Sequence, residues 1–503
     1  MGELVSHLGL GFSVALSLQN VVLCFVGAML GTLVGVLPGI GPIATISILL
    51  PATFGLEPVS ALIMVAGIYY GAQYGSSTTA ILMSIPGETS STVTCLDGHQ
   101  MAKQGRAGIA LGIAAIGSFF AGSVTTIFVA ALAIPLTKFA LGFGPVEFFS
   151  LMVMGLVFAA ALAHGSMFNA VIAIIFGVLL STVGPDLVTA QLRMTFGVNE
   201  LADGINFAIL GMGLFGIGEI LRNLETSMSR EVLKSTIGRL LPGLKELRES
   251  AWPIIRGTIV GGGLGILPGN GAVLGAFASY TIEKKIARDS TRFGHGAIEG
   301  VAGPESANNA GAQASFIPLL TLGIPPNAVM AIMVGAMTIH GIVPGPRVIS
   351  SNPELFWGLI ASMWIGNLML LVINLPLISI WVKLLAVPYR LLFPTIIILC
   401  CIGVYSLSGS TVDIVLLAVF GLLGYAMSKF GFEPAPMTLG VVLGSRLEEA
   451  LQQSMIISDG DFSIFFTRPI SAALLFCTAI LVVIVLLPNV SKRREEVFVE
   501  EDD

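Results

Sequence analysis

Long apolar runs separated by short polar connections dominate this sequence. A helix needs about 20 apolar residues to cross the hydrocarbon core of a bilayer. Runs of this kind cover residues 20–37, 109–136, 167–183, 356–382 and 471–487. Because a chain in lipid must satisfy its own backbone hydrogen bonds, the pattern predicts an all-α polytopic membrane protein with about 10 to 13 transmembrane helices.

Composition supports this class. Only 11% of the residues are charged, against about 25% in soluble domains, and the mean hydropathy is +0.92. The 60 glycines and 25 prolines are typical of closely packed and broken membrane helices. The sequence has no phosphate-binding Gly-Lys-Ser/Thr motif, so we expect an ion gradient rather than ATP to supply the energy of any transport.

One motif occurs twice. The segment Gly31–Gly41 recurs as Gly261–Gly271, with six of 11 positions identical at an offset of 230. Two further matches follow in the same order, Gly-Ala-Gln at 71–73 and 311–313 and Ile-Pro at 85–86 and 324–325. Landmarks that recur in order predict an internal structural repeat.

Basic residues define the predicted domain organisation. Seven Lys and Arg lie between Arg222 and Arg256, and four more lie at 284–292. The positive-inside rule places both segments and the basic C-terminal tail in the cytoplasm, and the N-terminus, with no basic residue before Lys103, in the periplasm. The predicted units are a first membrane half at 1–220, a cytoplasmic linker at 221–256, a second membrane half at 257–390, additional membrane helices at 391–490 and a charged cytoplasmic tail at 491–503.

Equivalent loops of the two copies differ in charge. Residues 51–58 contain no Lys or Arg, whereas residues 281–288 contain three. Conversely, residues 97–106 contain two and residues 338–346 contain none. Equivalent loops are therefore expected on opposite sides of the membrane, which predicts an inverted-topology repeat with broken or re-entrant helices.

The repeated Leu-Pro-Gly-x-Gly motifs are predicted to break membrane helices. Proline removes a backbone hydrogen-bond donor, and glycine allows backbone conformations that end a helix. Non-helical backbone at membrane depth is tolerated where it is buried in protein or lines a water-filled cavity. The N-terminus of the following half-helix would then suit an anion, although a plain kink is the alternative. The predicted motif residues are Pro38, Gly39, Gly41, Pro268, Gly269, Asn270 and Gly271.

Polar residues cluster inside apolar runs of both copies. Hydroxyls, amides and backbone groups can bind a carboxylate or a small cation, although single Ser and Thr residues often bond only the carbonyl one turn back. Glu88 and Glu305 are candidates for proton or cation coupling, whereas Glu147 and Glu354 are ordinary first-turn carboxylates. The predicted substrate- or ion-binding residues are Ser76, Ser77, Thr78, Pro86, Gly87, Glu305, Asn308, Asn309, Gln313 and Ser315.

Several motifs together resemble a known family. They are the two Leu-Pro-Gly-x-Gly segments, Leu-Asp-Gly at 96–98, Gly-Pro-x-Glu at 144–147, Glu-Lys-Lys at 283–285 and Pro-Glu-x-x-Asn-Asn at 304–309. In this order they resemble the large membrane subunit (TctA type) of the tripartite tricarboxylate transporter family. The matching positions carried over are Pro38, Gly39, Gly41, Pro268, Gly269, Gly271, Pro304, Glu305, Asn308 and Asn309.

The resemblance implies a permease subunit of the bacterial inner membrane that imports tricarboxylates or related organic carboxylates. It also implies two partners, a small four-helix membrane subunit and a periplasmic solute-binding protein, and a proton or sodium gradient as the driving force. No cofactor, resident metal or nucleic-acid partner is expected, and a transported sodium site is left unassigned. No Arg lies clearly within a span to bind a carboxylate.

Three alternatives remain open from the sequence. A stand-alone ion-coupled carrier for organic anions would need no binding protein. A membrane-embedded enzyme would need an acid–base or metal cluster, which the sequence lacks. A passive channel would not depend on an ion gradient.

The predicted inversion can be tested by labelling. Cysteines introduced as Gly55→Cys and Ala287→Cys should react with a membrane-impermeant maleimide from opposite sides of the membrane. Labelling of both from the same side would contradict the inversion.

Overall fold

The computed structural model describes residues 2–37, 41–163, 166–186, 189–225, 238–385 and 389–486. Within this part of the chain the structure is helical apart from one short hairpin, in which β1 (Gly184–Pro185) pairs antiparallel with β2 (Leu192–Arg193). The predicted all-α class is confirmed. Pro38, Gly39, part of the 221–256 linker and the 491–503 tail lie outside the described residues.

The helices follow one another with short connections. A π-helical segment, Met212–Ile217, joins α9 to α10. In chain order the helices are α1 Gly2–Ala15, α2 Leu18–Val36, α3 Pro42–Leu49, α4 Pro58–Met83, α5 Thr92–Lys103, α6 Ala107–Ala140, α7 Pro145–Leu162, α8 Met167–Ser181, α9 Phe207–Gly211, α10 Gly218–Glu225, α11 Leu244–Leu264, α12 Gly271–Ile286, α13 Glu299–Ala314, α14 Phe316–Leu322, α15 Ala328–Ile339, α16 Val348–Ser351, α17 Pro353–Asn374, α18 Ile378–Leu384, α19 Tyr389–Ser408, α20 Thr411–Lys429, α21 Pro434–Ile457, α22 Ile464–Thr467 and α23 Pro469–Leu486.

Six helical segments in the described residues are long and apolar enough to cross a membrane. They are α2, α6, α7, the combined segment Phe207–Glu225, α17 and α20. Shorter apolar helices cover Leu4–Ala15, Met167–Ser181, Ala328–Ile339, Phe393–Ser406 and Pro469–Val485. The predicted membrane class is thus confirmed in outline, whereas the larger span count stays a prediction.

One predicted apolar run is divided. The apolar run 356–382 contains most of the candidate span α17, which ends at Asn374, and α18 begins at Ile378. Pro376 lies in the turn between them. Proline lacks the N–H that a continuing helix needs and restricts the residue before it, so the run is divided at this point.

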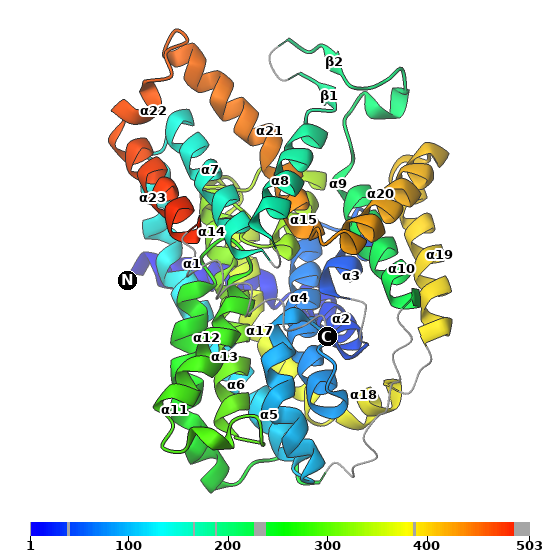
Figure 1. Ribbon diagram of the computed structural model, residues 1–503, viewed down its shortest axis with the longest axis vertical. Coiled ribbons are helices and arrows are strands. Elements are labelled where there is room, and N and C mark those ends of the chain that lie inside the picture. Colours follow the sequence, from blue (N-terminus) through cyan, green and yellow to red (C-terminus); the bar gives the residue numbers. More distant parts are fainter. Residues whose placement is uncertain are drawn as a thin grey trace.

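The helices group into two ends joined by a central set (Figure 1). At one end α11, α12 and α13 pack together, and α13 also contacts α5 and α6. At the other end α7, α8, α21 and α23 pack on one another. Between them α2 packs along α4, and α17 packs on both α4 and α6.

Glycines bring α2 and α4 into backbone contact. A Cβ added to any of three glycines on one face of α2 would collide with a backbone carbonyl oxygen of α4. Such spacing allows helix axes to approach closely, as small residues do in membrane interfaces. The pairs are Gly27 with Met64, Gly31 with Ile68 and Gly35 with Ala72.

The same arrangement occurs between α11 and α13. Gly257, Gly261 and Gly265 face the carbonyl oxygens of Gly303, Ala307 and Gly311. These glycines lie 230 residues after those of α2, and their carbonyl partners lie 239 residues after those of α4. The two helix pairs therefore make the same kind of glycine-to-carbonyl contact at a constant sequence offset within each helix.

Substitution of one such glycine should destabilise the protein. Gly261→Val would force α11 away from α13, and overpacking of this kind costs about 1–3 kcal/mol or more. We expect a lower melting temperature in detergent. The matched control is Gly263→Val in the same helix, where an added Cβ meets nothing within 4 Å. Equal melting temperatures for the two variants would contradict the account.

Candidate functional site

Both Leu-Pro-Gly-x-Gly motifs coincide with interruptions between helices. In the first copy α2 ends at Val36, and Gly41 is the N-cap of α3. In the second, α11 ends at Leu264, and Asn270 is the N-cap of α12 with a left-handed backbone (φ 66°). The re-entrant course of these segments stays a prediction.

The second motif is fixed by the second Ile-Pro stretch. The N–H groups of Gly269 and Asn270 donate to the Pro326 oxygen at 2.8 and 3.3 Å. Gly269 has a φ of +100°, which favours glycine, and a Cβ on Gly271 would collide with the Leu264 oxygen. Pro268 lies in the same interruption. These predicted residues therefore shape the backbone.

The α14–α15 connection also contacts α4. The side-chain nitrogen of Asn327 lies 3.4 Å from the Tyr69 hydroxyl, and the Asn327 oxygen accepts the N–H of Met330 at 2.9 Å. Asn327 thus caps α15 and reaches the first half of the chain. Two residues 258 positions apart in the sequence meet at this point.

The carboxylate of Glu305 lies at the centre of the polar cluster. Its side chain is fully buried (0% exposed). Ser77 Oγ of α4 donates to Oε2 at 2.6 Å, and Thr94 Oγ1 of α5 donates to Oε1 at 2.6 Å. No Lys, Arg or His of the described chain forms an ion pair with this carboxylate. Three helices thus converge on an acidic group that has hydroxyl partners alone.

Hydroxyl partners suit both protonation states of Glu305. A buried carboxylate without a cation is costly, so a proton or a small cation would stabilise it. Ser77 Oγ also lies 3.4 Å from the Gln73 carbonyl oxygen. Because a hydroxyl rotates and both donates and accepts, Ser77 can donate to an ionised Glu305, or accept from a protonated one and donate to Gln73.

Asn308 and Asn309 differ in their side-chain hydrogen bonds. Asn309 Nδ2 donates to Ser118 Oγ of α6 at 2.7 Å and to the Glu305 backbone oxygen at 3.1 Å. Asn308 is fully buried, and neither of its side-chain polar atoms has a hydrogen-bond partner in the described structure. Gln313 Oε1 also has none. Since buried amides are normally paired, Asn308 and Gln313 offer free polar atoms to a bound species.

Two predicted hydroxyls donate to backbone oxygens three residues earlier in the chain. Ser76 Oγ donates to the Gln73 oxygen at 2.8 Å, and Ser315 Oγ donates to the Ala312 oxygen at 2.6 Å. This is the structural role weighed for single serines in the sequence. Ser315 also forms a side-chain hydrogen bond with Tyr69 of α4, and substrate or ion binding by Ser76 and Ser315 stays a prediction.

Pro86 and Gly87 belong to an irregular stretch after α4. A Cβ on Gly87 would collide with the Gly35 oxygen, so this stretch packs against the end of α2. Ser90 Oγ, just beyond it, donates to Gln73 Oε1 at 3.0 Å and lies 3.4 Å from Glu88 Oε2. The stretch therefore brings a second carboxylate next to the polar face of α4.

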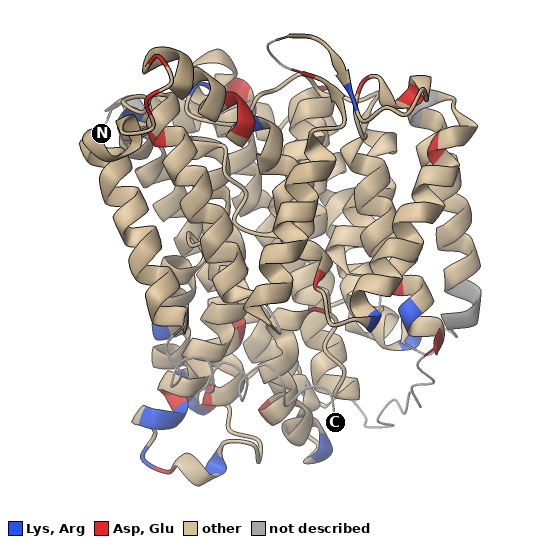
Figure 2. Cartoon of the chain, turned by 45° about the horizontal axis from the view of Figure 1, so that its top comes forward, with Lys and Arg blue, Asp and Glu red and all other residues tan. Residues whose placement is uncertain are grey.

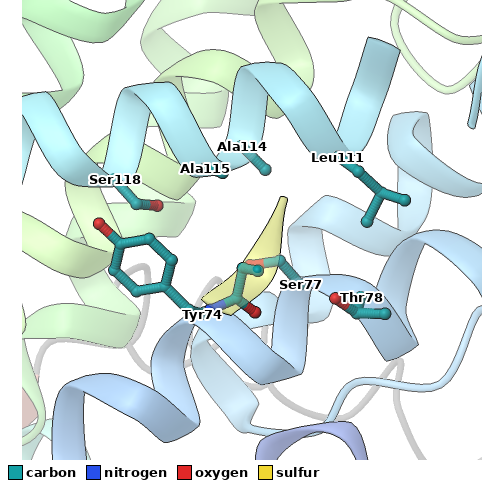
Figure 3. Close-up of a pocket in the computed structure, with 8 residues that line it drawn as sticks. Tyr74, Ser77, Thr78, Leu111, Ala114, Ala115 and Ser118 are labelled. Atoms are coloured by element: carbon teal, nitrogen blue, oxygen red, sulfur yellow. The ribbon is translucent and has the colours of Figure 1, made fainter. Parts of the chain in front are cut away.

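A small cavity lies between α4 and α6 beside this cluster (Figure 3). It offers about 10 Å³, which is room for about one water molecule. The Tyr74 hydroxyl, which points toward Ser118 in Figure 3, has no hydrogen-bond partner in the described structure. The lining residues are Tyr74, Ser77, Thr78, Leu111, Ala114, Ala115, Ser118 and Asn374.

Several residues of this site are not among those predicted from the sequence. Thr94, Ser118, Tyr74 and Asn374 lie outside the singled-out residues, although Tyr74 is next to the Gly-Ala-Gln landmark. Thr94 comes three residues before Asp97 of the Leu-Asp-Gly motif. That motif was the one available signal for this part of α5.

Asp97 joins the two halves of the chain. Its buried Oδ1 accepts N–H groups at 2.8–2.9 Å from the loop between α12 and α13, and its Oδ2 accepts the Tyr280 hydroxyl at 2.9 Å. The loop donors are Gly294, Gly296 and Ala297. Asp97 is fully paired, so its role is to hold α5 beside α13, where Thr94 reaches Glu305.

The described residues contain no group of three or more His, Cys, Asp and Glu that would hold a metal ion. The sodium site left unassigned from the sequence stays unassigned.

Glu147 accepts the N–H of Gly144 at 2.8 Å and lies 3.4 Å from Arg468, which is the helix-end role expected for it.

The described helices, six segments of which are long and apolar enough to cross a membrane, enclose a buried polar cluster. The family described as "Tripartite tricarboxylate transporter TctA family" matches residues 21–439, and the chain belongs to this family. The predicted recognition is confirmed. As a member of a transporter family, the protein is not an enzyme.

Two relatives come from Agrobacterium vitis. The chain is 56% identical over 502 residues, which cover 100% of both chains, to an "Uncharacterized 52.8 kDa protein in TAR-I ttuC' 3'region". It is 58% identical over 239 residues, 48% of this chain and 99% of the relative, to an "Uncharacterized protein in TAR-II ttuC' 3'region". No solved structure matches the chain.

Alanine substitutions of Asn308 and Asn309 should distinguish an effect on stability from an effect on substrate binding. Asn309→Ala leaves buried Ser118 without its partner, a loss of about 1–3 kcal/mol, so its melting temperature should fall. Asn308→Ala removes no hydrogen bond and should have the smaller effect on the melting temperature. We expect both to lower substrate uptake by reconstituted vesicles. Unchanged uptake in both variants would show that this face of α13 is not the site.

Proposed function

We propose that the chain is the large permease subunit of a binding-protein-dependent secondary transporter. It imports tricarboxylates or related organic carboxylates by alternating access, driven by a proton or sodium gradient. Family membership supports the transporter class. The single observation that carries the coupling mechanism is the buried Glu305 carboxylate, which has two hydroxyl partners.

Glu305 is the proposed coupling group. Its ionised form at 0% exposure needs a proton or a small cation to offset the loss of hydration. Binding of that cation neutralises the cluster and lowers its repulsion of an anionic substrate. Free polar atoms on Asn308 and Gln313 then lie one turn or two further along the same helix for the substrate or the cation.

The proposed partners are a small four-helix membrane subunit and a periplasmic solute-binding protein. Support for both is the family to which the chain belongs. The alternative is a stand-alone ion-coupled carrier for organic anions. Uptake by this chain alone, without either partner, would favour the alternative.

The proposed orientation rests on charge. Lys and Arg residues gather at the end of the molecule where α11 begins and α12 ends (Figure 2). By the positive-inside rule this end faces the cytoplasm of the bacterial inner membrane, with the N-terminus periplasmic and the C-terminus cytoplasmic. The matched glycine contacts of α2 with α4 and of α11 with α13 support a structural repeat. The different Lys and Arg content of its equivalent loops supports an inverted arrangement, in which the two interrupted segments enter from opposite faces.

Glu305→Gln tests the coupling role. A neutral amide no longer binds and releases the coupling cation, so accumulation of labelled citrate against its gradient should fall at least about tenfold. Exchange of citrate across vesicles without a gradient should persist, because it needs no net cation movement. The vesicles contain this chain with both partners.

The matched control is Glu354→Gln, the same substitution at an exposed first-turn carboxylate of α17. It should accumulate citrate as the wild type does. Undiminished gradient-driven accumulation in Glu305→Gln would contradict the coupling role. Accumulation by wild-type vesicles without any proton or sodium gradient would contradict the secondary-transporter proposal.

A further inference from the structure

An arginine lies beside the α14–α15 connection. Arg446 belongs to α21, which packs against α15 (Figure 1). Its Nη1 donates to the Pro344 oxygen at 3.0 Å. A Cβ placed on Gly323 would lie 3.0 Å from the same Nη1. The guanidinium therefore lies against Gly323, the residue at which the connection begins.

Most of the Arg446 donors have no partner in the described structure. A guanidinium carries five N–H donors, and the hydrogen bond to Pro344 is the one that the described residues provide. Of the acidic neighbours on α21, Glu448 pairs with Arg193 at 2.6 Å, whereas Glu449 accepts from Gln453 and interacts with Arg446 through its charge alone. No carboxylate of the described chain forms an ion pair with Arg446.

The connection links Arg446 to the candidate site. Gly323 ends α14 with a left-handed backbone (φ 74°). Four residues later, Asn327 reaches Tyr69 of α4, and between them Pro326 accepts the N–H groups of the second Leu-Pro-Gly-x-Gly motif. A short, constrained piece of backbone thus separates the guanidinium from the polar face of α4.

The polar cluster has no positive group of its own in the described structure. Its ionisable carboxyl groups are Glu88 and Glu305, and its other members are hydroxyls and amides. A positive side chain along the path would stabilise an organic anion with two or three carboxylates. The planar fork of a guanidinium matches the two oxygens of a carboxylate, and the hydrogen bond to Pro344 fixes its orientation.

We propose that Arg446 binds one carboxylate of the transported organic anion at the α14–α15 connection. The inference rests on the proposed function and adds to it a residue that recognises the charge of the substrate. Helix ends and neutral groups then bind the remainder of the anion, and Glu305 binds the coupling cation.

Ligand-dependent stabilisation of the purified large subunit tests this inference. Anion binding raises the melting temperature by an amount set by the ligand concentration and the dissociation constant. Citrate and tricarballylate are the probes, because the second carries three carboxylates without the hydroxyl. Arg446→Gln should raise the concentration for half-maximal stabilisation by about tenfold or more, the size expected for one charge-assisted hydrogen bond.

Two further variants make the result specific. Arg446→Lys keeps the charge but cannot bind a carboxylate in the bidentate geometry of a guanidinium. Its ligand concentration for half-maximal stabilisation should therefore lie between those of the wild type and Arg446→Gln. Lys138→Gln, at an exposed lysine in the last turn of α6, removes one positive charge elsewhere and should bind as the wild type does.

The possible contrary results distinguish a failure of the Arg446 inference from a failure of the proposed function. If Arg446→Gln needs the same ligand concentration for half-maximal stabilisation as the wild type, the inference is overturned. If its melting temperature without ligand is also lower, Arg446 has a structural role. Gradient-driven citrate uptake by the wild type without any stabilisation by citrate or tricarballylate would also overturn it, and leave the proposed function standing. Stabilisation that depends on Arg446, together with a failure of gradient-driven uptake, would overturn the proposed function and support the binding role.

Discussion

A buried carboxylate without a positive partner is the constraint on which the rest of the site depends. Ser77 and Thr94 donate to Glu305, so helices α4 and α5 must each place a hydroxyl within about 3 Å of the Glu305 carboxylate of α13. Hydroxyls on flexible chains do not achieve this unless the helix backbones are held firmly. The close packing of the surrounding helices therefore follows from the chemistry of this one group.

Two devices hold the helices in place. Glycine-to-carbonyl contacts fix α2 against α4 and α11 against α13, and because an added Cβ would meet backbone rather than a flexible side chain, the contact does not adapt. Asp97 then ties α5 to the loop before α13 through three backbone donors and Tyr280. Together they join the first half of the sequence to the second at the level of Glu305.

The sequence predicted those features that depend on local chemistry. Apolar runs identified membrane helices, and each Pro-Gly motif coincides with a helix interruption because proline and glycine act on the backbone where they stand. Within the run 356–382, Pro376 lies between α17 and α18, a boundary that the apolar pattern alone does not show. Ser77, Glu305 and Asn309 were singled out as polar residues in apolar runs, and the structure brings their neighbourhoods together.

Other features depend on tertiary contacts that no local pattern contains. Thr94 and Ser118 look like ordinary helix residues until α5 and α6 pack against α13. Asn308 and Asn309 are adjacent and identical in type, yet Asn309 is bonded to Ser118 and Asn308 has free polar atoms. Arg446 is separated from the polar motifs by more than 100 residues and reaches them only through the packing of α21.

The central claim is that the coupling cation binds at Glu305 in the same cycle as the substrate. Reciprocal linkage then requires that substrate affinity depend on the cation. The most direct measurement is the affinity of the purified protein for citrate at varied pH and varied sodium concentration, in the wild type and in Glu305→Gln. The account predicts that affinity in the wild type changes with one of the two cations and that this dependence disappears in Glu305→Gln. The same cation dependence in both proteins would contradict it.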